Sequence, residues 1–188
     1  MVYYSLEDDS TEISKRIVTG LAGVPFFPQH SLKLVAARNA LKQLPIRVVD
    51  SMQSLSAICA SIAQFSQRKE AGLVIVDYAQ LVQAESLKEN REQQVSEVSR
   101  TFRQTCMKWR VPMLLLCQLN EDGRTRESRA LEQDCTAMWL LERIADEPNV
   151  MSLSVPFQRN GPSEQVFRVT FRGEVSRIEN YQPERDER

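Results

Sequence analysis

Residues 72–78, with the sequence Gly-Leu-Val-Ile-Val-Asp-Tyr, constrain the fold of this chain more than any other segment. A short run of branched apolar residues favours a strand buried on both faces of a parallel sheet. Because an ionised carboxylate is costly to bury without a partner, we expect Asp77 at the open carboxyl end of that strand, where α/β sheets bind ligands. In nucleoside triphosphatases an Asp at this point holds Mg²⁺. An ordinary core strand, with Asp77 capping the next turn, is the alternative interpretation of this segment.

Three other segments share this design, in which an apolar run of strand length stops at a polar side chain. They are residues 1–7, 46–50 and 113–118. Helical patterns lie between them, and alternating strands and helices predict a parallel sheet with helices on both faces. Glu7, Asp77 and Gln118 would then converge on one crevice, as a base, a metal ligand and an amide sensor. This combination suits phosphoryl transfer.

The helices and the remaining strands are predicted from caps, periodicity and turns. Asp9-Ser10-Thr11 supplies a cap for a helix over residues 12–20, and Asn90 with Gln93 resembles a capping box. Further helices are expected over residues 32–44 and from residue 54. We expect residues 137–141 to form another buried strand, and residues 151–155 and 166–171 to form an antiparallel hairpin.

Composition bounds the remaining possibilities. The 188 residues, 42% apolar, are enough for one domain, predicted over residues 1–182 with a charged tail at 183–188. A net charge of −1 gives no global field to attract nucleic acid or membrane. No membrane span and no signal peptide is recognisable, which predicts a cytoplasmic protein without a membrane partner. One His and four scattered Cys argue against a zinc site or a His-based triad.

Taken in order from Tyr3 to Asn180, several segments resemble the C-terminal motor domain of DnaB-type replicative helicases. The similar segments are the strand ending in Glu7 (catalytic Glu strand), residues 76–81 (Walker B strand), 89–100 (the helix after it), 117–120 (sensor strand), 126–128 with 132–134 (DNA-binding loop and turn) and 158–162 (arginine-finger segment). The resemblance implies a RecA-like three-layer αβα fold with a mostly parallel sheet and a C-terminal antiparallel hairpin.

The resemblance also implies roles for single residues. Glu7 would polarise the attacking water, Asp77 would hold Mg²⁺, and Gln118 would sense the γ-phosphate of ATP. Arg159 would reach into the nucleotide site of a neighbouring subunit, where a planar guanidinium stabilises the transferring phosphate. ATP and Mg²⁺ are therefore the implied cofactors, and other subunits of a hexamer are implied partners.

A polar segment would carry the contacts with DNA. Arg126 and Glu127 match the family's DNA-binding loop, and Arg124 and Arg129 add positive charge beside them. Arg129 stands where the family usually has Gly, which reduces backbone freedom. Single-stranded DNA and other replication proteins complete the implied partners.

One motif of the family is missing from these residues. No G-x-x-x-x-G-K-[ST] loop occurs among them, and in the family this loop precedes the strand that carries the catalytic Glu. We therefore expect the sheet to lack the phosphate-loop strand and the chain alone not to hydrolyse ATP. The strands at 113–117 and 137–141, which flank the phosphate-loop strand in the RecA-like fold, should pair directly or accept a segment of another chain.

The leading interpretation is a fragment or degenerate relative of a replicative helicase motor domain, and whether the chain is itself an enzyme stays open. One alternative is a non-catalytic RecA-like interaction module of a replication complex. Another is a relative of the RecA and DNA-repair ATPases, which share the fold and the Walker B strand.

Overall fold

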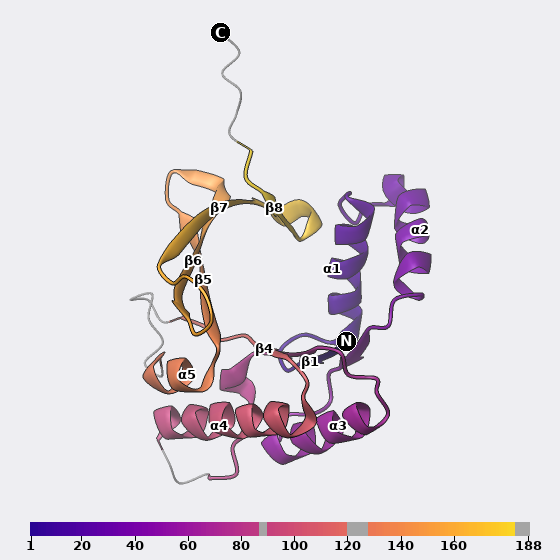
Figure 1. Ribbon diagram of the computed structural model, residues 1–188. Coiled ribbons are helices and arrows are strands. Elements are labelled where there is room, and N and C mark those ends of the chain that lie inside the picture. The colour runs from indigo at the N-terminus through magenta and orange to yellow at the C-terminus, as the bar shows by residue number, and fades with distance from the viewer. Residues whose placement is uncertain (87–89, 120–127, 183–188) are drawn as a thin grey trace. The chain divides into compact units, whose positions relative to one another are not determined.

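The computed structural model describes residues 1–86, 90–119 and 128–182, with the side chains of residues 128–130 left out of the description. The chain divides into two compact units. Unit 1 comprises residues 1–14 and 42–135, and unit 2 comprises residues 15–41 and 136–188. Each unit has its own sheet, and Figure 1 labels several elements of each unit.

The sheet of unit 1 has four parallel strands. They are β1 (Val2–Ser5), β2 (Arg47–Val49), β3 (Val74–Asp77) and β4 (Met113–Leu115), in the spatial order β2-β1-β3-β4. Val2 lies beside Val74, and Val74 beside Met113, so the three strands β1, β3 and β4 start level with one another. The parallel sheet expected from the apolar runs is confirmed.

The core of unit 1 lies between this sheet and two helices, α3 (Leu55–Gln67) and α4 (Arg91–Trp109). Alternate residues of the strands, such as Tyr4 and Val76, are fully buried against Ile58 and Ile62 of α3 and against Val98 and Phe102 of α4. The Tyr4 hydroxyl lies 2.9 Å from the Ser61 hydroxyl, which satisfies both buried groups. The side of α4 that carries Val98 and Phe102 is therefore part of the core.

Local capping signals formed as the sequence predicts. The Asp9 carboxylate accepts hydrogen bonds from the N–H groups of Thr11 and Glu12 and so caps α1 (Ser10–Ala22). Asn90 and Gln93 form a reciprocal capping box at the start of α4. Two shorter helices complete unit 1: the 3-10 turn η2 (Ala79–Leu81) and α5 (Ser128–Asp134).

Unit 2 contains a four-stranded antiparallel sheet in sequential order, made of β5 (Ala137–Ile144), β6 (Glu147–Gln158), β7 (Gln165–Arg172) and β8 (Arg177–Asn180). The expected hairpin is present, with Met151 opposite Val169 and Leu153 opposite Phe167. It forms the centre of this larger sheet. The unit also includes most of α1, the 3-10 turns η1 (Pro28–His30) and η3 (Gly173–Val175), and α2 (Ser31–Leu41).

The prediction of a buried strand over residues 137–141 is wrong in both burial and partner. β5 pairs antiparallel with β6 through a turn at residues 145–146, and Trp139 is 62% exposed. The expected direct pairing of residues 137–141 with residues 113–117 is also wrong, because β4 is the last strand of the parallel sheet and β5 belongs to the antiparallel sheet. The alternative expectation, that a segment of another chain lies beside β4, stays a prediction. An apolar run of this length fits either sheet, and the turn that follows it selected the antiparallel partner.

No helix in the described part of the chain is long and apolar enough to cross a membrane.

Candidate functional site

The candidate site lies at the carboxyl edge of the parallel sheet in unit 1. Strands β1, β3 and β4 are adjacent and parallel, with Ser5 opposite Asp77 and Val76 opposite Leu115. Parallel strands end at the same edge, so Glu7 after β1, Asp77 at the end of β3 and Gln118 after β4 are brought to one edge. Glu7 and Gln118 are exposed and Asp77 is half-buried. These side chains are therefore accessible to a ligand from solvent.

Backbone hydrogen bonds hold the chain around Asp77. The Leu6 N–H donates to the Asp77 carbonyl at 2.9 Å, and the Leu116 N–H donates to the Val76 carbonyl at 3.0 Å. The Ala79 N–H then donates to the Leu116 carbonyl at 2.8 Å, which continues the contact between the two segments beyond the strands. The peptide bond between Asp77 and Tyr78 is cis. The backbone on both sides of Asp77 is therefore hydrogen-bonded to the segments that follow β1 and β4.

Tyr3 contacts Asp77 directly. Tyr3 lies opposite Ile75 in the register of β1 and β3, so Tyr3 and Asp77 share a face of the sheet on adjacent strands. The Tyr3 hydroxyl donates a hydrogen bond to Oδ2 of Asp77. Sequence reasoning missed Tyr3. Residues two apart in a strand share a face, so Tyr3 lies on the same face as Ser5, which stands opposite Asp77. The sequence alone could not show this contact, because it does not give the order of the strands.

Gln80 holds the backbone of Gln118. Its side-chain nitrogen donates to the Gln118 carbonyl at 3.1 Å, and its side-chain oxygen accepts from the Gln118 N–H at 3.2 Å. The primary amide of Gln80 therefore takes the place of a neighbouring strand beside Gln118. This contact sets where the Gln118 side chain leaves the backbone. Sequence reasoning assigned Gln80 to the Walker B segment without giving it this role.

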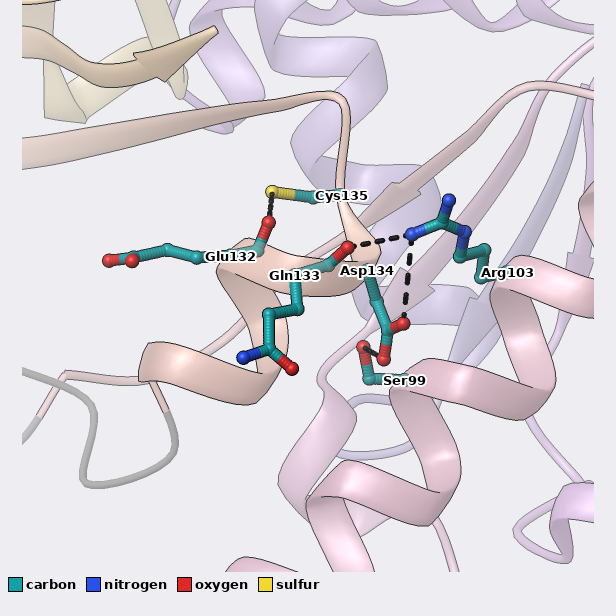
Figure 2. A network of polar contacts seen from close by, with 6 residues as sticks. All are labelled: Ser99, Arg103, Glu132, Gln133, Asp134 and Cys135. Carbon is teal, nitrogen blue, oxygen red and sulfur yellow. Dashed lines mark hydrogen bonds and ion pairs between the residues drawn. The ribbon is translucent and has the colours of Figure 1, made fainter. Parts of the chain in front are cut away.

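A second polar network lies at the end of α5 (Figure 2). The Ser99 hydroxyl donates to Oδ2 of Asp134 at 3.0 Å, and Arg103 donates to the Gln133 carbonyl at 2.6 Å. Arg103 also lies 3.8 Å from Oδ1 of Asp134. Ser99 and Arg103 belong to α4, so this network joins the two helices. It is another feature that the sequence pattern did not indicate.

The remaining candidate residues lie elsewhere. Arg159 belongs to unit 2, where it follows β6 with an exposed side chain, and its N–H donates to the Thr136 carbonyl at 2.8 Å. Arg129 lies within α5. The positions of Arg124, Arg126 and Glu127 fall outside the described residues. The proposed DNA contacts of these residues stay predictions.

The donor set at the sheet edge suits Mg²⁺ bound together with phosphates. Within the described ranges, no three His, Cys, Asp or Glu side chains cluster as a metal site. Mg²⁺ needs no such cluster, because it keeps several waters and usually binds one or two carboxylates plus substrate phosphates. Asp77, with one oxygen engaged by Tyr3, provides a carboxylate of this kind.

A pocket of about 310 Å³ lies next to this edge in unit 1. Its lining includes Gln80 but not Glu7, Asp77 or Gln118. The residues around it are Gln53, Gln80, Leu81, Val82, Gln83, Ala84, Arg91 and Gln94. The pocket is thus separate from the three converging side chains.

The fold is that of RecA-like helicase ATPase domains. One solved structure, described as an ATPase domain, superposes with a TM-score of 0.86 at 24% identity, over 96% of this chain and 74% of that one. A DnaB-like replicative helicase, solved in a study of its interactions with primase, gives a TM-score of 0.86 at 24% identity over 96% of this chain and 50% of that one. The RadB recombinase superposes less closely, with a TM-score of 0.60 at 16% identity over 96% of this chain and 79% of that one.

Within that fold, the chain belongs to the DnaB-like helicase C-terminal domain family, whose model matches residues 1–180. The replicative DNA helicase DnaB of Leifsonia xyli is 31% identical over 97% of this chain. The corresponding helicase of Geobacillus stearothermophilus is 30% identical over 85% of it. The chain covers 45% and 39% of the lengths of these two relatives. The family resemblance and the RecA-like fold are confirmed, and the alternatives of an interaction module or a recombinase relative are not favoured.

Proposed function

We propose that the chain contributes the catalytic Glu, the Mg²⁺-binding Asp and the sensor Gln of a motor that couples ATP hydrolysis to movement along single-stranded DNA. The observation that supports this most directly is the position of Glu7, Asp77 and Gln118 at the ends of three adjacent parallel strands. Residues 1–182 would act as one motor domain, and the match of the family model to residues 1–180 supports this.

Each residue would perform a distinct task at this edge. Glu7 is exposed and would accept a proton from the attacking water as a general base. Asp77, oriented by Tyr3, would hold the cation that accompanies the nucleotide. Gln118, whose backbone is fixed by Gln80, would donate a hydrogen bond to the terminal phosphate. Bound Mg-ATP would supply the phosphoryl group and the cation that neutralises its charge.

The proposed motor also requires an arginine that acts on a neighbouring subunit and residues that contact DNA. Arg159 is exposed in unit 2 and would act on the nucleotide of an adjacent subunit. Arg124, Arg126, Glu127 and Arg129 would contact single-stranded DNA. Other helicase subunits and replication proteins would be the partners, and the cytoplasm is the proposed compartment. No phosphate loop occurs among the 188 residues, so we expect this chain alone not to turn over ATP.

A chimera tests the proposed function. Residues 1–182 would replace the matching segment of the Geobacillus stearothermophilus relative, whose remaining sequence supplies the other parts of a helicase. Malachite-green assays with Mg-ATP and single-stranded DNA would measure phosphate release. We expect turnover by the chimera and none by the isolated chain.

The Glu7→Gln substitution should reduce turnover by the chimera by about 10²-fold or more, the usual contribution of a general base. Glu12→Gln is a matched control, because it removes the same charge from an exposed residue in the first turn of α1. A folded chimera without ATPase activity, or one that Glu7→Gln leaves unaffected, would contradict the proposed roles.

A further inference from the structure

Helix α5 depends on contacts with α4. It has 7 residues, and isolated helices of that length are unstable in water because nucleation is costly. Leu131 of α5 is 7% exposed and so anchors the helix by an apolar contact. An apolar anchor fixes distance but little orientation. The polar contacts at the last turn of α5 therefore decide how this end of the helix is held.

The first of these contacts is a buried hydrogen bond to a carboxylate. Ser99 is 5% exposed, and its hydroxyl donates to Oδ2 of Asp134 at 3.0 Å. The side chain of Asp134 is 18% exposed. Hydrogen bonds to charged groups are stronger than neutral ones, and a buried partner left unsatisfied is costly. Ser99 therefore specifies the position of Asp134 more strongly than a surface contact would.

The second contact caps the carboxyl end of α5. Nη1 of Arg103 lies 2.6 Å from the Gln133 carbonyl, one of the groups that a helix leaves unpaired at this end. The same guanidinium nitrogen lies 3.8 Å from Oδ1 of Asp134. Figure 2 shows both contacts converging from α4 on the final residues of α5, with the Glu132 carboxylate lying apart from them.

Helix α4 is itself fixed to the sheet. Val98 and Phe102 lie on the same stretch of α4 as Ser99 and Arg103, and both are buried in the cluster that contains Val74 and Val76 of β3. β3 ends in Asp77. Packed side chains and hydrogen bonds thus connect β3, which ends in Asp77, through α4 to the end of α5.

We propose that Ser99 and Arg103 are positioning residues for single-stranded DNA binding, acting through Asp134. They set the orientation of α5, and this helix carries Arg129, one of the residues proposed to contact DNA. The proposal rests on the proposed function, because it requires that Arg129 in α5 contacts DNA. By thermodynamic linkage, DNA bound there must in turn stabilise the contact between α4 and α5.

Two substitutions break the network without adding bulk, and one serves as a control. Asp134→Asn removes the carboxylate, and Ser99→Ala removes its buried donor while keeping a residue that favours helix. Glu132→Gln also removes one negative charge from α5, at an exposed side chain. If charge alone governed DNA affinity, Asp134→Asn and Glu132→Gln would both strengthen binding. The positioning role predicts that Asp134→Asn weakens binding.

Hydrogen–deuterium exchange and DNA binding would be measured on the same proteins. Exchange followed by mass spectrometry reports on α5 without DNA, and fluorescence anisotropy with a labelled oligo-dT reports on affinity. In Asp134→Asn and Ser99→Ala we expect exchange in α5 to accelerate about tenfold, as loss of a hydrogen bond to a charged group implies. We expect affinity to fall about three- to tenfold, because less of the protein is in the binding conformation. Glu132→Gln should change exchange little.

Unchanged exchange in both Asp134→Asn and Ser99→Ala would overturn the proposal, because α5 would then not depend on this network. Faster exchange with undiminished affinity would also overturn it, because the orientation of α5 would not matter for DNA. Absence of DNA binding by the unsubstituted chain would contradict the DNA-binding part of the proposed function and the positioning role with it. In that case the exchange data would still show whether the network holds α5.

Discussion

The Tyr3 hydroxyl donates a hydrogen bond to the carboxylate of Asp77 from the neighbouring strand. The two residues share one face because Tyr3 lies opposite Ile75 in the register of β1 and β3. A carboxylate at a strand end is otherwise free to rotate. This contact restrains its rotamer and engages one of its two oxygens.

The Tyr3→Phe substitution should destabilise the protein by about 1.5 kcal/mol, because it removes a hydrogen bond to a charged group and keeps the ring. Urea unfolding would measure the free energy, and a double-mutant cycle with Asp77→Asn should show coupling between the two positions. Tyr4→Phe is the matched control, because it removes the hydroxyl bonded to Ser61 and should not couple with Asp77→Asn. Independent effects of Tyr3→Phe and Asp77→Asn would show that the contact contributes nothing.

We expect Gln80→Leu to loosen the segment that carries Gln118. The leucine has similar bulk but cannot replace the two hydrogen bonds to the Gln118 backbone. Amide exchange in residues 116–119 should accelerate severalfold, since each lost hydrogen bond is worth about 1 kcal/mol. Gln83→Leu breaks the side-chain pair with Gln53 and serves as the control. Equal exchange in both variants would rule out a specific role for Gln80.

Binding of single-stranded DNA by the chain should be weak and should weaken further as salt is added. Three arginines, at positions 124, 126 and 129, offer few phosphate contacts. Their simultaneous replacement by Ala should reduce the slope of log affinity against log salt by about 2. Fluorescence anisotropy over a salt series measures this slope. Replacement of Lys33, Arg38 and Lys42 by Ala serves as the control. It removes the same charge from exposed side chains outside the proposed DNA-binding segment, so the slope should stay nearly unchanged. The opposite ranking of the two triple variants would place the DNA site elsewhere.

Burial raises the pKa of the Cys106 thiol to about 11, with a smaller contribution from the nearby Cys59. Below the ordinary thiol pKa of 9.0 the group is protonated in both folded and unfolded chains, so it does not affect the pH dependence of stability. Between the two values the unfolded chain loses this proton and the folded one keeps it, so stability falls as pH rises. Urea unfolding from pH 8 to about 11 should show a smaller decline in Cys106→Ala than in the unsubstituted chain. Identical declines would indicate an ordinary, accessible thiol.

The sequence determined those features whose causes lie within a few residues of each other. The capping box of Asn90 and Gln93 and the cap at Asp9 form between neighbours along the chain, so their spacing is sufficient to predict them. The branched apolar run before Asp77 favours a buried strand wherever that strand is placed. Alternation of such runs with helical segments then predicted the parallel sheet and the convergence of its strand ends at one edge.

The tertiary structure decided which segments became neighbours. Residues 137–141 form an apolar run that suits a parallel or an antiparallel partner, and pairing with β6 decided between them. The contacts of Tyr3 with Asp77, Gln80 with Gln118, and Ser99 with Asp134 join residues far apart in the chain. A hydrogen bond of this kind depends on strand order, register and helix packing together. No local pattern carries that information, because each of these contacts exists only after distant segments have closed around a common core.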